Sequence, residues 1–182
     1  MLSLVVRRSI GPRVAVAVRR DLRRQLQRAM RAAALADAQV CLTLSDDAEL
    51  HQLNLAYAGE DHATDVLSFA QRDPQAAGRP PLPAGVPEPL GDIIISVPIA
   101  ERQAAAQGHD LLHELLHLAV HGLCHLVGYD HATAEEERVM FGYEALLREQ
   151  ARRGGRVVAV RAPAGPGAAA ALATGDQTTT AY

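Results

Sequence analysis

The chain has 182 residues, of which 48% are hydrophobic and only 3% aromatic, and it contains no tryptophan. This length and composition allow one domain whose core is built from aliphatic side chains. The formal net charge of -3 argues against a protein that coats nucleic acid by overall positive charge, so a polyanionic ligand would have to meet a local patch or a metal.

The sequence shows no feature of a secreted or membrane protein. Cys41 and Cys124 provide neither a disulfide framework nor a Cys-x-x-Cys site, which fits a reducing cytosol. No apolar run approaches the roughly 20 residues that a membrane-spanning helix needs. The run before Arg7 is also too short for a signal peptide. We therefore expect a cytoplasmic protein that does not bind membranes.

The first elements expected are a short strand and an amphipathic helix. Valine alternates with alanine between Arg13 and Val18, which predicts the strand, and Asp21 is expected to open the helix. The helix should bury one stripe of residues, namely Leu22, Leu26, Met30 and Ala33 or Ala34. The same region carries six arginines: Arg19, Arg20, Arg23, Arg24, Arg28 and Arg31. These could face the phosphates of a nucleic acid, although a solvated helix face is the more common explanation of such a run.

A second strand and a second helix are expected next. The apolar residues 40–44 are typical of a strand, and residues 45–47 supply the cap of a helix that ends at Gly59. Leu50, Leu53 and Tyr57 lie on one face of that helix.

The middle of the chain should hold two strands separated by a long loop. Residues 65–69 are branched and aromatic, and residues 90–96 form the most apolar strand, which is expected at the centre of the sheet. Between them, residues 74–89 are rich in proline and are expected to form a functional or mobile loop. Pro98 suits the first turn of a following helix that ends at Gly108.

Two more helices are expected before the chain changes character. The first is rich in histidine and spans about residues 110–127, and the second runs from Ala134 to about Arg152. Three glutamates open the second helix, where acids interact well with the N-terminal dipole. We expect one domain over residues 1–152. Residues 153–182 are rich in Ala, Gly, Pro and Thr and are expected to form a flexible tail.

This order of elements predicts an α+β fold, with a small mixed β-sheet packed against several helices. Strands and helices do not follow a strict βαβ rhythm, and no glycine-rich fingerprint is present, so we expect no nucleotide cofactor. A serine elbow and a P-loop are absent too. A metal site would therefore have to carry the chemistry.

His121, His125 and His131 are the predicted metal ligands. Two histidines four residues apart on a helix stand on one face, which suits two imidazoles that bind one metal ion. Gly128 can adopt the left-handed conformation that ends a helix and turns the chain back. His131 follows three residues later, and three residues span at most about 10 Å. The site is thus expected at the C-terminal end of the histidine-rich helix.

The same helix contains a competing motif. The string His113-Glu114-Leu115-Leu116-His117 matches the zinc-protease signature, in which the glutamate acts as general base. His117, however, lies about 16 Å along the helix axis from Gly128, out of reach of His131. We therefore expect His113 and His117 to occupy a partly buried helix face or to surround the metal ligands.

The string from His121 to His131 resembles the signature of the YbeY family, metal-dependent endoribonucleases of bacterial ribosomal RNA maturation. Residues 53–57, 64–69 and 90–95 agree with that family in content and order, and the likeness spans about residues 38–150. The resemblance implies that His121, His125 and His131 bind one zinc ion in an α+β fold. It also implies a single-strand-specific endoribonuclease whose partners are ribosomal RNA and the small ribosomal subunit, acting in end processing and ribosome quality control.

The sequence departs from the family pattern just after Tyr57. The family usually places an arginine there that is thought to matter for RNA cleavage, and this chain has Ala58. Ala63 and Ala70 also stand where prolines are common. Loss of the arginine removes a plausible phosphate clamp, so that either another arginine takes its place or the nuclease is weak.

Three neutral imidazoles suit hydrolysis of a phosphodiester, because they leave the zinc charge uncompensated and a fourth position open for water. The general acid and base stay unassigned, with Asp130 and Asp92 as candidates. Two alternatives remain open. A metalloprotease-like hydrolase is disfavoured because Gly122 stands where such an enzyme has glutamate. A ribosome-assembly binding factor with a structural zinc stays open because of Ala58.

Overall fold

The computed structural model of the protein describes residues 1–71, 83, 85–153 and 155–160. Its strands are β1 (Leu2–Val6), β2 (Ala38–Ser45), β3 (Val66–Ala70) and β4 (Glu88–Ser96). Its helices are α1 (Val16–Ala32), α2 (Asp47–Ala58), α3 (Val97–Gln107), α4 (Leu111–Leu126) and α5 (Ala134–Arg152). None of the helices in this described part combines the length and apolar character that a membrane span requires.

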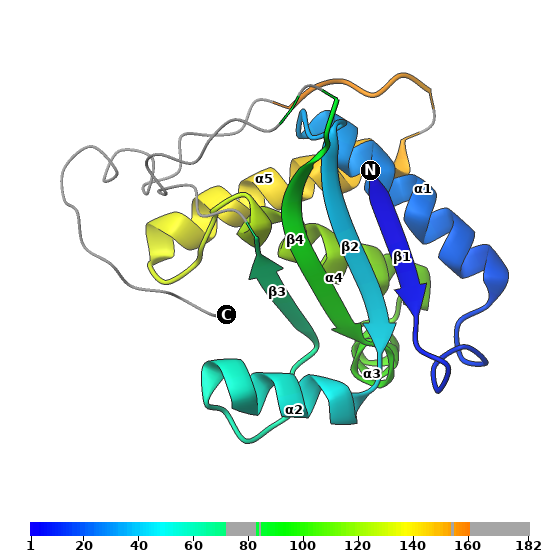
Figure 1. The fold of residues 1–182 in the computed structure, drawn as a ribbon. Coiled ribbons are helices and arrows are strands. Elements are labelled where there is room, and N and C mark those ends of the chain that lie inside the picture. The colour runs from blue at the N-terminus through cyan, green and yellow to red at the C-terminus, as the bar shows by residue number, and fades with distance from the viewer. Residues whose placement is uncertain (72–82, 84, 154, 161–182) are drawn as a thin grey trace.

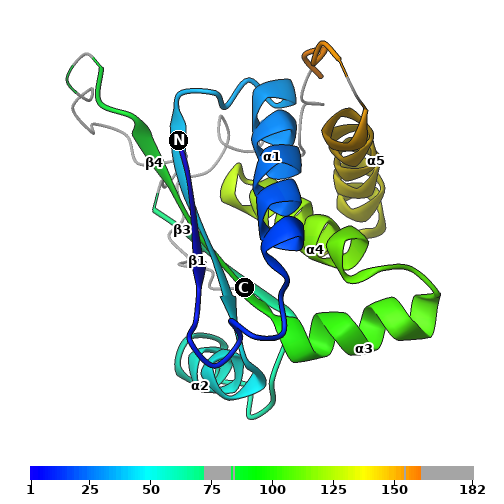
Figure 2. The ribbon, with the colours of Figure 1, turned by 90° about the vertical axis from the view of Figure 1, so that its right-hand side faces the viewer.

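The strands form one mixed sheet in the order β1-β2-β4-β3 (Figure 1). β2 pairs in parallel with both β1 and β4, whereas β3 runs antiparallel to β4. Figure 2, which views the sheet nearly edge-on, shows α1, α4 and α5 on the same side of it. The predicted α+β fold with a small mixed sheet is therefore confirmed.

The core lies between the sheet and these helices. Leu42 and Leu44 of β2 and Ile93 and Ile95 of β4 are fully buried, as expected for the two central strands. The middle and C-terminal stretches of α4 are buried on most sides, with residues 114–116, 118–120 and 122–124 all buried. α4 is therefore the central helix of the fold, and beyond its first turn only a few of its residues are partly exposed to solvent.

The expectation for the N-terminal region was wrong. The strand expected between Arg13 and Val18 is instead a turn that leads into α1, and Val16 is 76% exposed. The edge strand is β1, which the sequence pattern did not reveal and which pairs Leu2 with Val40. The amide of Arg13 donates to the carbonyl of Ile10 at 2.9 Å and α1 begins at Val16, so the backbone of this stretch is already engaged in turn and helix hydrogen bonds.

The apolar faces of α1 and α2 are buried to different extents. In α1, Leu22, Leu26 and Met30 are buried as expected and Ala29 and Ala32 join them; of the two alternatives for the last position, Ala33 packs against the core and Ala34 is exposed. In α2, Leu50 is buried, whereas Tyr57 is 59% exposed and its ring lies edge-on to that of Phe69. α2 covers the end of the sheet rather than its face (Figure 1), so only part of its apolar surface is buried, and Leu55 is 50% exposed.

The remaining helices begin and end close to their expected positions. Gly59 and Gly108 are the C-caps of α2 and α3, and Thr133 caps α5. The expected loop over residues 74–89 falls mostly outside the described residues, and its last two residues belong to β4. Within the expected tail, the amide of Val160 donates to the carbonyl of Ala32 at 2.8 Å. Residues 161–182 lie outside the described part of the chain.

Candidate metal centre

The three predicted histidines lie together at the end of α4. His121 and His125 come from its last two turns, and His131 comes from the loop that leads to α5. One nitrogen of each imidazole can be chosen so that all three atoms lie within 4.8 Å of one another. The Nε2 atoms of His121 and His125 are 3.1 Å apart. This spacing suits three nitrogens that converge on one cation.

The loop that carries His131 is fixed by local hydrogen bonds. Gly128 adopts a positive φ of 91°, and its amide donates to the carbonyl of His125 at 2.9 Å. The amide of His131 then donates to Oδ1 of Asp130 at 2.8 Å. Thr133 and Glu136 form a capping box that starts α5 immediately afterwards. The turn predicted at Gly128 therefore brings His131 back to the helix, as the spacing required.

Gly122 lets α4 approach the sheet closely just below the cluster. A Cβ atom at this position would lie 2.8 Å from both Cγ2 of Ile93 and Oγ of Ser68. The two neighbours belong to β4 and β3, so a side chain at this position would press on the sheet and force them to shift. A glutamate, which the metalloprotease hypothesis needs at this position, does not fit.

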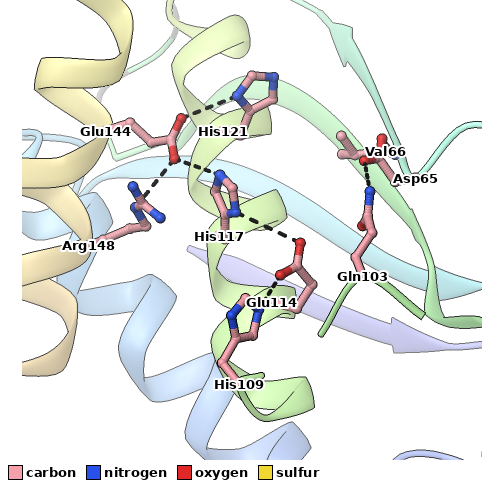
Figure 3. A network of polar contacts seen from close by, with 9 residues as sticks. All are labelled: Asp65, Val66, Gln103, His109, Glu114, His117, His121, Glu144 and Arg148. Atoms are coloured by element: carbon pink, nitrogen blue, oxygen red, sulfur yellow. Dashed lines mark hydrogen bonds and ion pairs between the residues drawn. The ribbon is translucent and has the colours of Figure 1, made fainter. Parts of the chain in front are cut away.

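Glu144 of α5 connects the cluster to the neighbouring helix (Figure 3). Its Oε2 accepts from Nδ1 of His121 at 3.2 Å, and its Oε1 lies 3.1 Å from Nε2 of His117 and 3.3 Å from Nε of Arg148. The Glu144 side chain is only 2% exposed. With Nδ1 of His121 committed to this bond, its Nε2 is left to face the other two histidines.

The charge state of Glu144 follows from the same contacts. Burial alone raises the pKa of this carboxyl, but hydrogen bonds from His117 and His121, together with the charge of Arg148, outweigh burial and bring the pKa to about 2. Glu144 is therefore an anion at neutral pH and accepts hydrogen bonds only. Sequence reasoning missed this residue. The signal available in the sequence was the position of Glu144, an acidic residue within the apolar stripe of α5 that Met140, Tyr143 and Leu147 form.

The competing motif points to a different set of partners. Glu114 is 1% exposed, and its carboxylate hydrogen-bonds to His109 and lies 3.8 Å from Nδ1 of His117. The ring of His113 stacks on His109 with 4.3 Å between centroids. Among the described residues, only His121, His125 and His131 form a group suited to a metal. His117 instead contacts Glu144, which in turn accepts from His121, so His117 lies in the layer around the candidate ligands. This is one of the two roles expected for it.

The protonation state of His125 favours metal binding. Burial, followed by the charges of His121 and His131, lowers the pKa of His125 from 6.5 to about 4. The imidazole is therefore neutral at physiological pH, the form that binds metals. Burial also raises the pKa of the neighbouring Cys124 thiol, so that Cys124 behaves as a small apolar core residue.

The two aspartates considered as acid or base differ in position. Gly91 and Ile93 of β4 both face α4, so Asp92 between them points to the opposite face of the sheet, where it accepts from Gln71 at 2.8 Å. Asp130 is close enough to His125 for its charge to act on that imidazole. The position of Asp130 thus suits the site, whereas that of Asp92 does not.

The arginines of α1 contact their own chain. Arg19 donates to the carbonyls of Val14 and Gly11, Arg23 to that of Leu2, and Arg28 to that of Gln150. Arg20 and Arg24 both pair with Asp21. These contacts support a solvated helix face with structural roles over a phosphate-binding face.

Comparison with known proteins agrees with this architecture. A family model described as Endoribonuclease YbeY matches residues 13–152. The chain belongs to the YbeY family. Endoribonuclease YbeY of Geobacillus kaustophilus is 50% identical over 104 residues, which cover 57% of this chain and 67% of that protein. Endoribonuclease YbeY of Moorella thermoacetica is 50% identical over 119 residues, which cover 63% of this chain and 76% of that protein.

A third relative carries the same family name, and one solved structure shares the fold. Endoribonuclease YbeY of Halalkalibacterium halodurans is 45% identical over 123 residues, or 66% of this chain and 77% of that protein. A solution structure of a Thermotoga maritima protein matches with a TM-score of 0.55 and 22% identity, over 86% of this chain and 100% of that one. The structural match shows the fold alone. Membership of an endoribonuclease family supports a role as a nuclease.

Proposed function

We propose that this protein is a zinc-dependent, single-strand-specific endoribonuclease that acts in the maturation of small-subunit ribosomal RNA and in ribosome quality control. The observation that carries the proposal is the convergence of three imidazoles at the end of α4 in a member of an endoribonuclease family. Its partners would be ribosomal RNA and the small ribosomal subunit, in the cytoplasm.

The donor set fits zinc. His121, His125 and His131 would hold one ion, and three imidazole nitrogens leave the fourth tetrahedral position open. Among the described residues no carboxylate joins this group, so the charge of the ion would stay available for a phosphate. His131 is exposed, which keeps the site open to a substrate.

Zinc bound there would lower the pKa of a water molecule to about 7 and polarise a phosphoryl oxygen. The protein contributes orientation, because Glu144 fixes the ring of His121 and the turn at Gly128 fixes His131. Of the two aspartates considered as general acid or base, Asp130 is the better candidate because it lies near His125. The general acid and base stay unassigned.

The two alternatives differ in the observations behind them. The metalloprotease hypothesis loses its general base, because Gly122 packs on the sheet where a glutamate would be needed. The hypothesis of a ribosome-assembly factor with a structural zinc rests on Ala58, an exposed residue at the end of α2 that offers no charge to a phosphate. An open, exposed ligand such as His131 favours a catalytic over a structural site.

The deciding experiment compares substrates and metal states. The purified protein is incubated with ribosomal RNA and with a generic peptide substrate, each with and without a chelator. We expect RNA cleavage that stops with chelator and in His121→Ala but persists in His113→Ala, a histidine on the same helix outside the cluster. Peptide cleavage would establish the protease, and ribosome binding without any cleavage would establish the assembly factor.

A further inference from the structure

Two rows of side chains meet along the seam between α4 and α5. The partly exposed positions of α4 recur every four residues, at His113, His117, His121 and His125. On α5 the facing positions are Phe141, Ala145, Arg148 and Arg152. The helices run antiparallel here, because Phe141 lies beside His121 while Arg148 and Arg152 lie beside His113. The seam therefore leads from the histidine cluster to a group of arginines.

An open pocket of about 470 Å³ lies at the arginine end of this seam. Its lining residues are His113, Ala145, Arg148, Glu149, Arg152 and Arg153. Three guanidinium groups face one carboxylate, so the pocket carries net positive charge. Glu149 is engaged by Arg153 and Arg148 lies against Glu144, whereas Arg152 makes no ion pair with any described residue. At least one cation is thus available to a ligand.

The field in this pocket acts on a neighbouring imidazole. Burial lowers the pKa of His113, and the positive charges of Arg152, His109 and Arg148 lower it further. The charges of Arg152 and Arg148 therefore disfavour a further cation at this position. The small side chain of Ala145 leaves the space between the two helices open for a ligand.

We propose that this pocket binds a backbone phosphate of single-stranded RNA at a distance from the bond that is cleaved. His113 precedes His121 by eight residues, which corresponds to about 12 Å along α4. Proteins that hold single strands combine positive side chains along the backbone with aromatic rings on which bases stack. Phe141, 46% exposed and with its ring 6.5 Å from that of His121, supplies the aromatic at the cluster end. This inference rests on the proposed function and adds where the strand lies.

The test uses Arg152→Ala combined with Arg153→Ala in the zinc-loaded protein. The matched control is Arg20→Ala, another exposed helix arginine, which lies outside the pocket and, within the described part of the chain, forms an ion pair with Asp21 alone. For a single-stranded RNA of about 12 nucleotides we expect KM to rise about tenfold with kcat unchanged, because a remote phosphate contact contributes to binding and not to the reacting centre. The slope of log KM against log salt should fall by about 0.7 for each phosphate that the variant no longer binds.

Substrate length separates this pocket from a general loss of charge. A dinucleotide, whose single phosphodiester must lie at the cluster to be cleaved, should be cleaved equally by the double variant and the wild type. An unchanged KM of the double variant for the long RNA would overturn the proposal. So would an equal rise in its KM for the dinucleotide, or an equal rise in the KM of Arg20→Ala for the long RNA.

Direct binding keeps this inference distinct from the proposed function. The anisotropy of the same labelled 12-nucleotide RNA is measured in chelator, where no metal-dependent cleavage occurs. Wild-type protein that binds RNA without ever cleaving it would refute the nuclease, and weaker binding by the double variant would still support the pocket. If the wild type does not bind the RNA at all, the pocket proposal fails as well.

Discussion

Glu144 of α5 accepts a hydrogen bond from Nδ1 of His121 of α4 at 3.2 Å, so that one helix sets the ring orientation of a candidate ligand on another. The same carboxylate also contacts His117. Each of these bonds crosses the interface between α4 and α5, and the cluster therefore depends on how that interface packs.

Glu144→Ala should weaken zinc binding by about 10- to 100-fold, because His121 loses the partner that selects its tautomer and orientation. The affinity is measured by competition with a chromophoric chelator. Glu149→Ala, which removes an exposed acid five residues later on the same helix, is the control. Glu144→Gln should retain part of the affinity, since the amide oxygen can still accept from Nδ1. Equal affinities for Glu144→Ala and Glu149→Ala would show that the bond does not orient the ligand.

Metal content should separate the two histidine motifs. The wild type is expected to bind one zinc ion per chain, and His121→Ala, His125→Ala and His131→Ala should each lose it on gel filtration in dilute chelator. His113→Ala should retain the metal, because its ring stacks on His109 away from the cluster. Metal is quantified by atomic emission. Retention of zinc by His131→Ala would contradict the proposed ligand set.

The stability of the metal-free protein should fall as pH drops from about 6.5 to about 4. The pKa of His125 is about 4 in the folded chain and 6.5 without the fold, so between these values only the unfolded chain takes up this proton. Urea midpoints at pH 7 and pH 4.5 measure the loss. His125→Asn should show a smaller loss than the wild type, and His62→Asn, at an exposed site, should behave like the wild type. Equal losses in all three proteins would argue against a neutral, partly buried His125.

Gly122→Ala should destabilise the protein by about 1–3 kcal/mol, because its new Cβ meets Ile93 and Ser68 at 2.8 Å. Gly142→Ala is the matched control within α5, since a Cβ there meets nothing within 4 Å. The control should stabilise the chain by about 0.5–1 kcal/mol, because alanine is the better helix former. Urea unfolding measures both changes. A neutral Gly122→Ala would mean that α4 can move away from the sheet.

The sequence was sufficient for the three-histidine cluster because all its determinants are local. Helix spacing places His121 and His125, and Gly128 with its positive φ places His131 within a few residues. The same holds for α2 to α5, whose caps are encoded by residues next to each helix end. Local rules of this kind need no knowledge of the rest of the chain.

What could not be predicted depends on contacts between distant segments. Leu2–Val6 is the edge strand because it pairs with β2, and the alternation after Arg13, which indicated a strand there, carries no information about that pairing. Glu144 lies 23 residues after His121, and only the antiparallel packing of α4 and α5 brings them together. The arginine pocket has the same origin, because His113 and Arg152 are adjacent only in the folded chain.

One candidate ligand, His131, belongs to the connection between α4 and α5, while the other two belong to α4 itself. A cation bound by all three would cross-link the central helix α4 to the segment that leads into α5. The attachment of α5 to α4 would then depend on zinc supply, and loss of the metal would first increase the mobility of the connection between the two helices. Proteolytic nicking after Gly128 would consequently report the metal status of the protein before any loss of its fold.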